Sequence, residues 1–242
     1  MKARADLLLV ERGLFASRAK AREAIEAGLV LVDGVALKKP SDMVDSKSKI
    51  EAQKPYRWVS RGGLKLEAGL THFQIDAKER VCLDVGSSTG GFTDVLLSRG
   101  AAKVFAVDVG QGQLHERLLR NKRVVSLEQT DARDLDETLI PEAPSLVVCD
   151  ASFISLKLVL PQALALAAEG AFLVALIKPQ FEAGREAVRE GRGIVRDEAI
   201  HEAVCADIAE WLAATGWNVL GIAPSPIEGG DGNREFLIGA RK

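Results

Sequence analysis

Val81-Cys-Leu-Asp-Val-Gly-Ser-Ser-Thr-Gly-Gly-Phe-Thr-Asp94 is the most informative segment of the chain. Its first five residues are mostly apolar, which is typical of a buried strand, and from Phe92 onward apolar residues recur at helical spacing. The glycines between them let the backbone turn sharply and come close to a ligand at a helix N-terminus. This order predicts the first ligand loop of a doubly wound α/β sheet, a Rossmann-like fold.

The loop does not match the dinucleotide-binding pattern Gly-x-Gly-x-x-Gly. Read from Gly86, the pattern needs a second glycine at position 88, where the chain has Ser88. Asp84 lies near the loop and would repel a phosphate, whereas a ligand without phosphates needs only close approach and polar contacts. We therefore expect S-adenosylmethionine rather than NAD, and a glycine turn without a ligand is the alternative.

Polar side chains follow three further strands of the predicted sheet. Asp108 follows the second strand, where a carboxylate can accept hydrogen bonds from ribose hydroxyls. Asp131 follows the third strand and can either reach an adenine amino group or cap a helix. Lys178 ends the apolar run Ala171–Ile177, where desolvation favours a neutral amine that can act as a base.

The strand Ser145–Cys149 ends in Asp150-Ala-Ser-Phe-Ile-Ser155. Methyltransferases of this architecture that act on exocyclic amines usually carry Asn/Asp-Pro-Pro-aromatic here, and this chain lacks both prolines. Methylation of an exocyclic amine is therefore disfavoured. Cys149 could attack carbon 5 of a pyrimidine, but its place in an apolar strand favours a buried structural thiol.

Length and composition indicate a cytoplasmic protein with a large domain and a small companion. The chain has 242 residues, 47% of them hydrophobic, which is ample for a core. Its three cysteines offer neither a disulfide framework nor zinc spacing, as expected in a reducing compartment. We find no cleavable signal and no apolar run of about 18 residues, so we expect no membrane partner.

The net charge of −2 conceals an asymmetry. Residues 1–65 contain 14 Lys and Arg against 8 Asp and Glu, and the remainder contains 18 against 26. A basic N-terminal region attracts polyanions such as nucleic acid, although an ordinary solvated surface would give the same count.

Two helices and a hairpin are predicted ahead of the sheet. Ala5–Leu14 has helical periodicity, Ser17 can cap a second helix, and Gly28 suits its end. Asp33-Gly34 between two short apolar segments predicts a type I′ hairpin.

This N-terminal pattern resembles the αL-motif RNA-binding domain of a ribosomal small-subunit protein and of pseudouridine synthases. The resemblance implies an RNA-binding domain over residues 1–60 in which the hairpin and the second helix contact phosphates. The implied helix contacts are Arg18, Lys20 and Arg22.

Pro55–Gly63 combines aromatic residues, arginines and glycines, as a connector between domains does. We expect Arg57, Trp58 and Arg61 to contact RNA. For Trp58 two interpretations stay open, because an indole can either pack between elements or stack on an exposed base.

Five motifs in combination resemble the TlyA family, over nearly the whole chain. They are Ser60–Leu66, Asp84–Thr93, Asp150–Leu156, Ile177–Glu182 and Gly232–Phe236. The family consists of ribosomal RNA 2′-O-methyltransferases with a catalytic domain similar to FtsJ, and its members are often labelled haemolysin A. The resemblance implies a catalytic domain over residues 61–242, S-adenosylmethionine as cofactor, and ribosomal RNA or ribosomal subunits as partner.

The resemblance also implies site residues and a mechanism without a metal ion. By analogy Lys178 removes the proton of a ribose 2′-hydroxyl, and three further residues position it and the target. The implied tetrad is Lys65, Asp150, Lys178 and Glu235. The implied cofactor contacts are Asp84, Gly86, Ser87, Ser88, Thr89, Gly90, Gly91, Asp108 and Asp131.

One loop departs from the family pattern. Where the family usually has Gly-Pro-x-Gly-Asn, this chain has Gly229-Gly-Asp-Gly-Asn233, so glycine replaces proline and we expect a looser support for Glu235. Two other functions stay open: an assembly factor that binds ribosomal RNA without turnover, and a pore-forming haemolysin.

Overall fold

The computed structural model describes residues 2–184, 188–189, 191, 193–229 and 232–242. The chain divides into two compact units, Met1–Arg57 and Trp58–Lys242, hereafter the N-terminal and the C-terminal unit. The predicted boundary after residue 60 falls close to this division.

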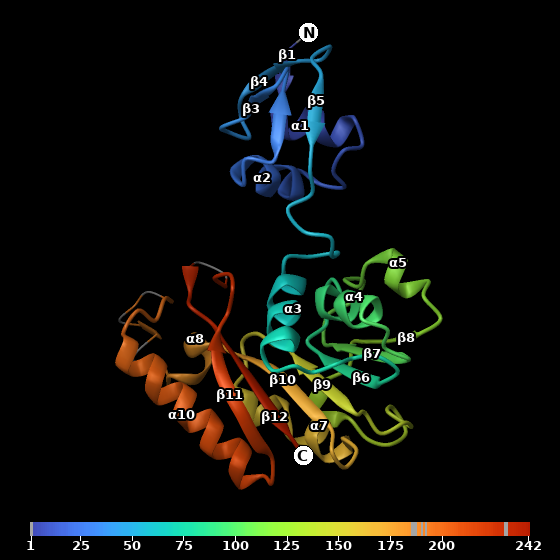
Figure 1. Ribbon diagram of the computed structural model, residues 1–242, viewed down its shortest axis with the longest axis vertical. Coiled ribbons are helices and arrows are strands. Elements are labelled where there is room, and N and C mark those ends of the chain that lie inside the picture. Colours follow the sequence, from blue (N-terminus) through green and yellow to red (C-terminus); the bar gives the residue numbers. More distant parts are fainter. Residues whose placement is uncertain (1, 185–187, 190, 192, 230–231) are drawn as a thin grey trace. The chain divides into compact units, whose positions relative to one another are not determined.

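The N-terminal unit has two helices and two small sheets (Figure 1). β1 pairs with β4, and the second sheet has the order β3-β2-β5, all antiparallel. The elements are β1 (Lys2–Arg4), α1 (Ala5–Glu11), α2 (Arg18–Glu26), β2 (Val30–Val32), β3 (Val35–Ala36), β4 (Met43–Asp45) and β5 (Ile50–Ala52).

Local sequence signals place α2 and the hairpin as expected, whereas α1 ends at Glu11, three residues before the predicted Leu14. The Ser17 side chain accepts a hydrogen bond from the Lys20 backbone and caps α2. Asp33 and Gly34 have φ of 50° and 81°, which confirms the predicted hairpin with two left-handed residues. Gly28 directly follows the C-cap Ala27 with φ of 71°, as expected of a glycine at the end of a helix.

The C-terminal unit is a doubly wound α/β fold around a seven-stranded sheet (Figure 1). Its order is β11-β12-β10-β9-β6-β7-β8, with β12 antiparallel to both neighbours and the other pairs parallel. The strands are β6 (Val81–Val85), β7 (Lys103–Asp108), β8 (Val124–Glu128), β9 (Leu146–Cys149), β10 (Phe172–Ile177), β11 (Asn218–Pro224) and β12 (Phe236–Arg241). This confirms the predicted fold class.

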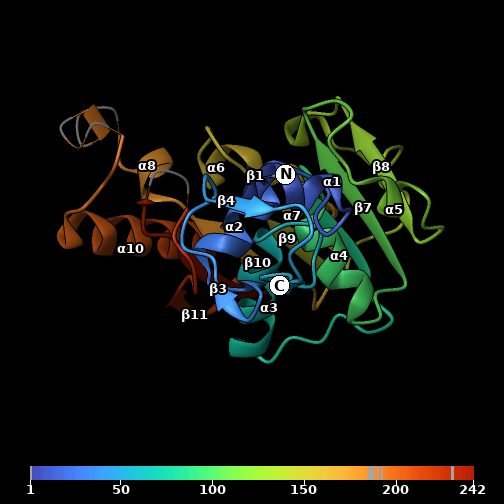
Figure 2. The same ribbon diagram turned by 90° about the horizontal axis from the view of Figure 1, so that it is seen from above.

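Helices pack on both faces of this sheet. On one face α3 and α4 contact each other and strands β6, β7, β10 and β12; α10 lies beside β11, as both views show (Figure 1; Figure 2). The helices are α3 (Gly62–His72), α4 (Gly91–Ser98), α5 (Glu116–Leu119), η1 (Ala132–Asp134), α6 (Leu156–Val159), α7 (Pro161–Leu166), α8 (Pro179–Glu182) and α10 (Glu198–Ala214).

The strand order reverses between β6 and β9, because the chain runs from β6 outward to β8 and then returns to β9 on the other side. Ligands of open α/β sheets bind beyond the carboxyl ends of the strands at such a point. The fold therefore locates the site before any side chain is considered.

Candidate active site

Two clefts meet at the carboxyl ends of β6 and β9. One has a volume of about 570 Å³ and contains two lysines, and we call it the lysine cleft. The other, of about 470 Å³, is lined by Asp108 and Asp131, and we call it the carboxylate cleft. Residues that line both are Gly86, Ser88, Asp150, Ser152 and Phe153.

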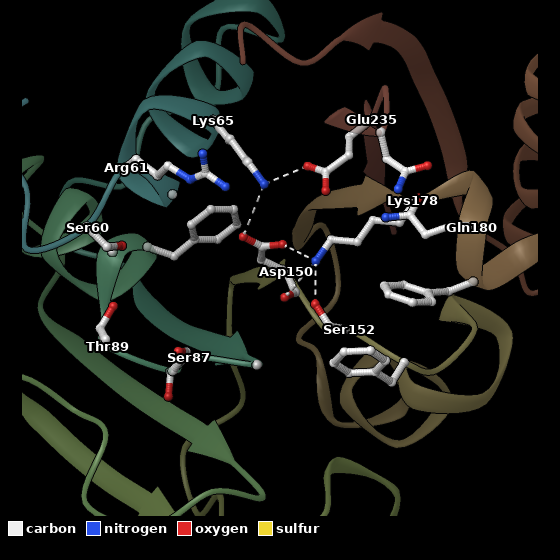
Figure 3. A pocket seen from close by; sticks show the side chains of 18 of the residues that line it. Ser60, Arg61, Lys65, Ser87, Thr89, Asp150, Ser152, Lys178, Gln180 and Glu235 are labelled. Carbon is white, nitrogen blue, oxygen red and sulfur yellow. Dashed lines mark hydrogen bonds and ion pairs between the residues drawn. The ribbon is translucent and has the colours of Figure 1, made fainter. Parts of the chain in front are cut away.

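The lysine cleft brings together the four residues that the family resemblance implied (Figure 3). Lys178 Nζ lies 2.6 Å from Asp150 Oδ1, and Lys65 Nζ lies 2.6 Å from Glu235 Oε2. Lys65 Nζ also lies 3.9 Å from Asp150 Oδ2, so Asp150 stands between the two lysines. Two positive and two negative charges thus form one continuous cluster.

The cluster is largely withdrawn from water. Lys65 and Lys178 are each 6% exposed and Glu235 is 4% exposed. Charges buried to this degree are costly unless they are paired, and each here has an opposite charge beside it. Water is a weak competitor in such a place, so the cluster can hold its geometry around a substrate.

Each member reaches the cleft from a different element. Asp150 follows β9 and Lys178 follows β10, and these strands are parallel neighbours whose ends meet at one edge. Glu235 comes just before β12, which is antiparallel to β10, so the start of β12 lies at that same edge. Lys65 comes from α3, which contacts β10 and β12.

Asp108 holds the loops around the carboxylate cleft. Its carboxylate accepts hydrogen bonds from the Ser88 amide at 2.8 Å and the Gly110 amide at 2.7 Å. Each carboxylate oxygen has a further lone pair, so Asp108 can still accept hydrogen bonds from ligand hydroxyls.

Asp131 has the capping role that the sequence allowed. It caps η1 by accepting a hydrogen bond from the Arg133 amide, and hydrogen bonds from the Arg133 guanidinium hold the pKa of its carboxyl below the usual value. Asp131 also lines the carboxylate cleft, so capping and a ligand contact are compatible.

The glycine loop forms a wall that side chains would obstruct. Gly86 has φ of 80°, and a Cβ there would lie 3.0 Å from the Ala151 backbone. A Cβ at Gly91 would lie 2.2 Å from Ser60 Oγ. Ser87, Ser88 and Thr89 line the lysine cleft between them. Close backbone approach and two carboxylates are what an adenosine ligand without a phosphate cradle requires, so the residues present fit S-adenosylmethionine.

Two predicted cofactor contacts lie outside both clefts. Asp84 is fully buried, because alternation along β6 turns it toward α4, where Thr93 Oγ1 donates a hydrogen bond to it at 2.6 Å. Burial raises the pKa of Asp84 to about 7. Gly90 has φ of 93°, and a Cβ there would lie 2.2 Å from Leu118. We therefore correct the predicted role of Asp84 and Gly90: they support the glycine loop on the side that faces away from the clefts.

Cys149 is fully buried, and burial raises the pKa of its thiol to about 12. A thiol that does not ionise is a poor nucleophile. The structural interpretation of Cys149 is therefore the one that the structure supports.

Trp58 is only 7% exposed, and a Cβ on Gly63 would lie 2.4 Å from its ring. A buried indole cannot stack on a base, so the predicted RNA contact of Trp58 is corrected to a packing role at the start of α3. Arg61 is exposed and lines the lysine cleft, and Arg57 is exposed.

The predicted cations of α2 differ in their surroundings. Arg18 Nη2 lies 2.7 Å from Asp6 Oδ2, and Asp6 is 1% exposed, so Arg18 neutralises a buried carboxylate. Hydrogen bonds from Arg4 and Arg18 hold the pKa of Asp6 well below its usual range. Arg22 is exposed and Lys20 is half-buried, and contact with RNA stays a prediction for these cations.

The clefts contain residues that the sequence did not single out. Ser152 Oγ lies 2.9 Å from Lys178 Nζ, and the Phe153 and Phe181 rings lie 5.1 Å apart beside it. Gln180 lines the lysine cleft, with a buried Oε1 that has no hydrogen-bond partner among the described residues. These residues lie inside the motifs Asp150–Leu156 and Ile177–Glu182, so their membership of these motifs could have identified them from the sequence.

The loop that departs from the family pattern is only partly described, because Gly230 and Asp231 lie outside the described residues. On its near side the Gly229 amide donates to the Asn233 carbonyl at 2.8 Å. The Asn233 side chain in turn accepts from the Val195 amide and donates to the Gly193 carbonyl. The flanks thus hold Glu235 in its pair with Lys65.

The described residues contain neither a metal-binding cluster nor a membrane-spanning helix. No three His, Cys, Asp or Glu side chains in that part of the chain are grouped to hold a metal ion. Among the same residues, no helix has both the length and the apolar character needed to cross a membrane.

The chain is similar to known proteins over its whole length. It is 44% identical over 242 residues to the 16S/23S rRNA (cytidine-2′-O)-methyltransferase TlyA of Mycobacterium tuberculosis, covering 99% of this chain and 90% of the relative. It is 40% identical over 235 residues to Hemolysin A of Brachyspira hyodysenteriae, covering 97% and 98%. A solved structure from Streptococcus thermophilus, described as a candidate hemolysin, is 43% identical, covers 100% of this chain and 88% of its own, and has a TM-score of 0.79.

Two family models divide the chain between them. The model for the S4 domain matches residues 4–50, and the model for the FtsJ-like methyltransferase matches residues 58–242. With relatives named TlyA at this identity, the expected resemblance is confirmed. The chain belongs to the FtsJ-like methyltransferase family, as a member of TlyA type that carries an S4 domain ahead of the methyltransferase domain.

Proposed function

We propose that this protein transfers a methyl group from S-adenosylmethionine to a ribose 2′-hydroxyl of ribosomal RNA. The observation that carries the proposal is the buried cluster of Lys65, Asp150, Lys178 and Glu235 where the two clefts meet. Buried charges that open onto a cleft are typical of sites for chemistry, since ion pairs of this kind contribute little net stability.

The carboxylate cleft is the proposed cofactor site. Asp108 would accept hydrogen bonds from the ribose hydroxyls of the cofactor, and Asp131 from its adenine amino group. Gly86 and Ser88 line both clefts and would hold the remainder of the cofactor toward the lysine cleft. When bound, S-adenosylmethionine supplies an electrophilic methyl group.

Lys178 is the proposed general base. Its Nζ would take the proton from the acceptor hydroxyl as the ribose oxygen becomes a nucleophile. Asp150 fixes Nζ by the contact at 2.6 Å, and Lys65 holds Asp150 from the other side. Glu235 anchors Lys65, so the three residues set the direction in which Lys178 points.

Ribosomal RNA is the proposed substrate for two reasons. The relative at 44% identity is named a ribosomal RNA cytidine-2′-O-methyltransferase, which supports a cytidine ribose as the acceptor. The N-terminal unit matches the S4 domain model and lies in the basic part of the sequence, as expected of a module that binds phosphates.

The test is methylation of 16S and 23S ribosomal RNA, both as free RNA and in purified subunits, with S-adenosylmethionine labelled in its methyl group. We expect label at a ribose 2′-oxygen of a defined nucleotide, and a rate of labelling that is about 10²- to 10⁴-fold lower with Lys178→Ala. Label on a base would contradict the proposal. Tight RNA binding without any transfer would instead identify an assembly factor.

Calorimetry tests the cofactor separately. We expect S-adenosylmethionine and S-adenosylhomocysteine to bind and NAD not to bind, because position 88 lacks the glycine that a pyrophosphate needs. Asp108→Ala should weaken the binding of both. Tight NAD binding with no response to S-adenosylmethionine would overturn the assignment.

A further inference from the structure

Three oxygens surround the Lys178 amine in the described part of the chain. They are Asp150 Oδ1 at 2.6 Å, Ser152 Oγ at 2.9 Å and the Asp150 carbonyl oxygen at 3.3 Å (Figure 3). A charged lysine has three N–H donors. Lys178 Nζ donates hydrogen bonds to Ser152 Oγ and to the Asp150 carbonyl oxygen, and it forms an ion pair with Asp150 Oδ1. To act as a base, however, Lys178 must first lose one of these three protons.

After Lys178 loses a proton, the three oxygens differ in whether they can face the nitrogen lone pair that is left. Both Asp150 oxygens are acceptors only, so a nitrogen lone pair that faced either of them would be repelled. The Ser152 hydroxyl can turn and donate its own hydrogen to the lone pair. We infer that Ser152 is a positioning residue for Lys178, whose hydroxyl fixes the side of Nζ on which the proton-accepting lone pair forms.

The side of Nζ that Ser152 occupies faces the junction of the two clefts. Ser152 is among the few residues that line both the lysine cleft and the carboxylate cleft. A lone pair on the Ser152 side therefore faces the place where an acceptor oxygen and a methyl donor would meet. This step rests on the proposed function, because it takes the two clefts as the sites of acceptor and donor.

The loop that carries Ser152 is fastened at both ends. Asp150 is fixed by the ion pair at one end, and at the other Glu182 accepts hydrogen bonds from Ser155 Oγ at 2.5 Å and the Leu156 amide at 2.8 Å. Glu182 belongs to α8, which directly follows Lys178, so the two strand ends are joined.

The residue after Ser152 is also strained. Phe153 has φ of 66°, a left-handed conformation that is uncommon for a bulky side chain and costs on the order of 1 kcal/mol or more. Such strain persists only where the surrounding contacts impose it. The loop is thus built to keep Ser152 in one place.

The proton balance is simple. Before transfer, Lys178 gives the proton that it shares with Ser152 to solvent water, which the exposed Ser152 can reach. When the acceptor ribose binds, its hydroxyl replaces the Ser152 hydroxyl as the hydrogen-bond donor to the lone pair on Nζ. During transfer, the ribose O–H bond breaks, its proton forms a new N–H bond on Nζ in the vacated position, and the electron pair of the broken bond stays on the ribose oxygen. The next loss of a proton to water restores the starting state, and Ser152 gains and loses nothing.

The experiment compares Ser152→Val with Ser152→Thr, which have nearly the same shape and differ in the hydroxyl. Single-turnover methylation of ribosomal RNA is measured with RNA and cofactor saturating, and cofactor affinity is measured by calorimetry. We expect Ser152→Val to lose about 10- to 100-fold in rate, the effect of misplacing a catalytic group, while its cofactor affinity stays equal to that of Ser152→Thr. Ser152→Thr should stay within a few-fold of the wild-type rate.

A double-mutant cycle shows whether Ser152 acts through Lys178. In a Lys178→Ala background, Ser152→Val should cause no further loss, because the group that it positions is gone. Losses that multiply in the double variant would overturn the inference. So would a wild-type rate for Ser152→Val, or a loss in Ser152→Thr as large as in Ser152→Val.

A failure of the proposed function gives a different result. If the wild-type protein transfers no methyl group to any ribosomal RNA, the proposed function falls, and with it the role of Ser152. If the wild-type protein is active and Ser152→Val is equally active, only the role of Ser152 falls.

Discussion

Lys178 is the side chain on which the proposed chemistry depends most directly. Lys178→Ala should leave cofactor binding nearly intact and reduce methyl transfer by about 10²- to 10⁴-fold, the usual effect of removing a positioned base. Lys178→Arg should fail as well, because a guanidinium stays protonated at any working pH. Single-turnover methylation of ribosomal RNA by both folded variants is the measurement. A near-wild-type rate for Lys178→Arg would mean that the residue acts only as a fixed positive charge.

The buried carboxyl of Asp84 should make the free energy of unfolding depend on pH. Its pKa in the folded protein is raised to about 7 from an ordinary value of 3.8, so the folded state favours the protonated form. As the pH rises from about 4 through about 7, ionisation of Asp84 should destabilise the wild type relative to Asp84→Asn, by up to about 4 kcal/mol. Urea unfolding of both proteins at pH 5 and pH 8 is the measurement. A difference in stability that does not change with pH would show that Asp84 stays ionised.

At the scale of elements, the start of α4 depends on Gly90. Gly90→Ala places a methyl group 2.2 Å from Leu118 and forces alanine to adopt φ of 93°. We expect a loss of more than about 1 kcal/mol in the free energy of unfolding, together with weaker binding of S-adenosylmethionine. Urea unfolding and calorimetry measure the two effects.

Gly112→Ala is the matched control for Gly90→Ala. Gly112 also has a left-handed φ, of 64°, but no atom in the described part of the chain lies within 4 Å of an added Cβ. It should therefore show only the conformational cost of about 1 kcal/mol or less. Equal effects of the two substitutions would mean that contact with Leu118 does not set the loop.

At the scale of the whole molecule, residues 1–57 should contribute RNA affinity rather than chemistry. Lys20→Ala with Arg22→Ala should weaken RNA binding and reduce the slope of log affinity against log salt by roughly two phosphate contacts, while cofactor binding is unchanged. Filter binding of ribosomal RNA across a salt series is the measurement. Normal affinity and slope would place the RNA surface elsewhere.

Arg18 needs separate treatment, because it pairs with the buried Asp6. Arg18→Ala removes one of the two arginines that neutralise that carboxylate, so it should destabilise the N-terminal unit as well as weaken RNA binding. Asp6→Asn is the control: it disturbs the same pair without removing a cation. If Asp6→Asn weakens RNA binding as much as Arg18→Ala does, the effect of Arg18 is structural.

The sequence by itself determined the local structure and the fold class. Alternation in Val81–Val85, the Ser17 cap and the Asp33-Gly34 turn act between residues that are neighbours in the chain, so they can be read without tertiary contacts. The order of strands and helices then left a doubly wound sheet as the outcome. The position of Lys178 at the end of an apolar run already indicated a base, whereas the complete set of four charged residues came from the family resemblance.

Tertiary structure alone decided which side chains meet and what surrounds them. Lys65 and Glu235 pair across 170 positions of sequence, and no periodicity encodes such a contact. Burial made Asp84 a packing residue in place of an expected cofactor contact, and for Trp58 it decided between the two open interpretations in favour of packing, since the face that a neighbouring helix covers is set by packing. Ser152 comes to lie beside Lys178 because two parallel strands end at the same edge, and only the folded sheet creates that edge.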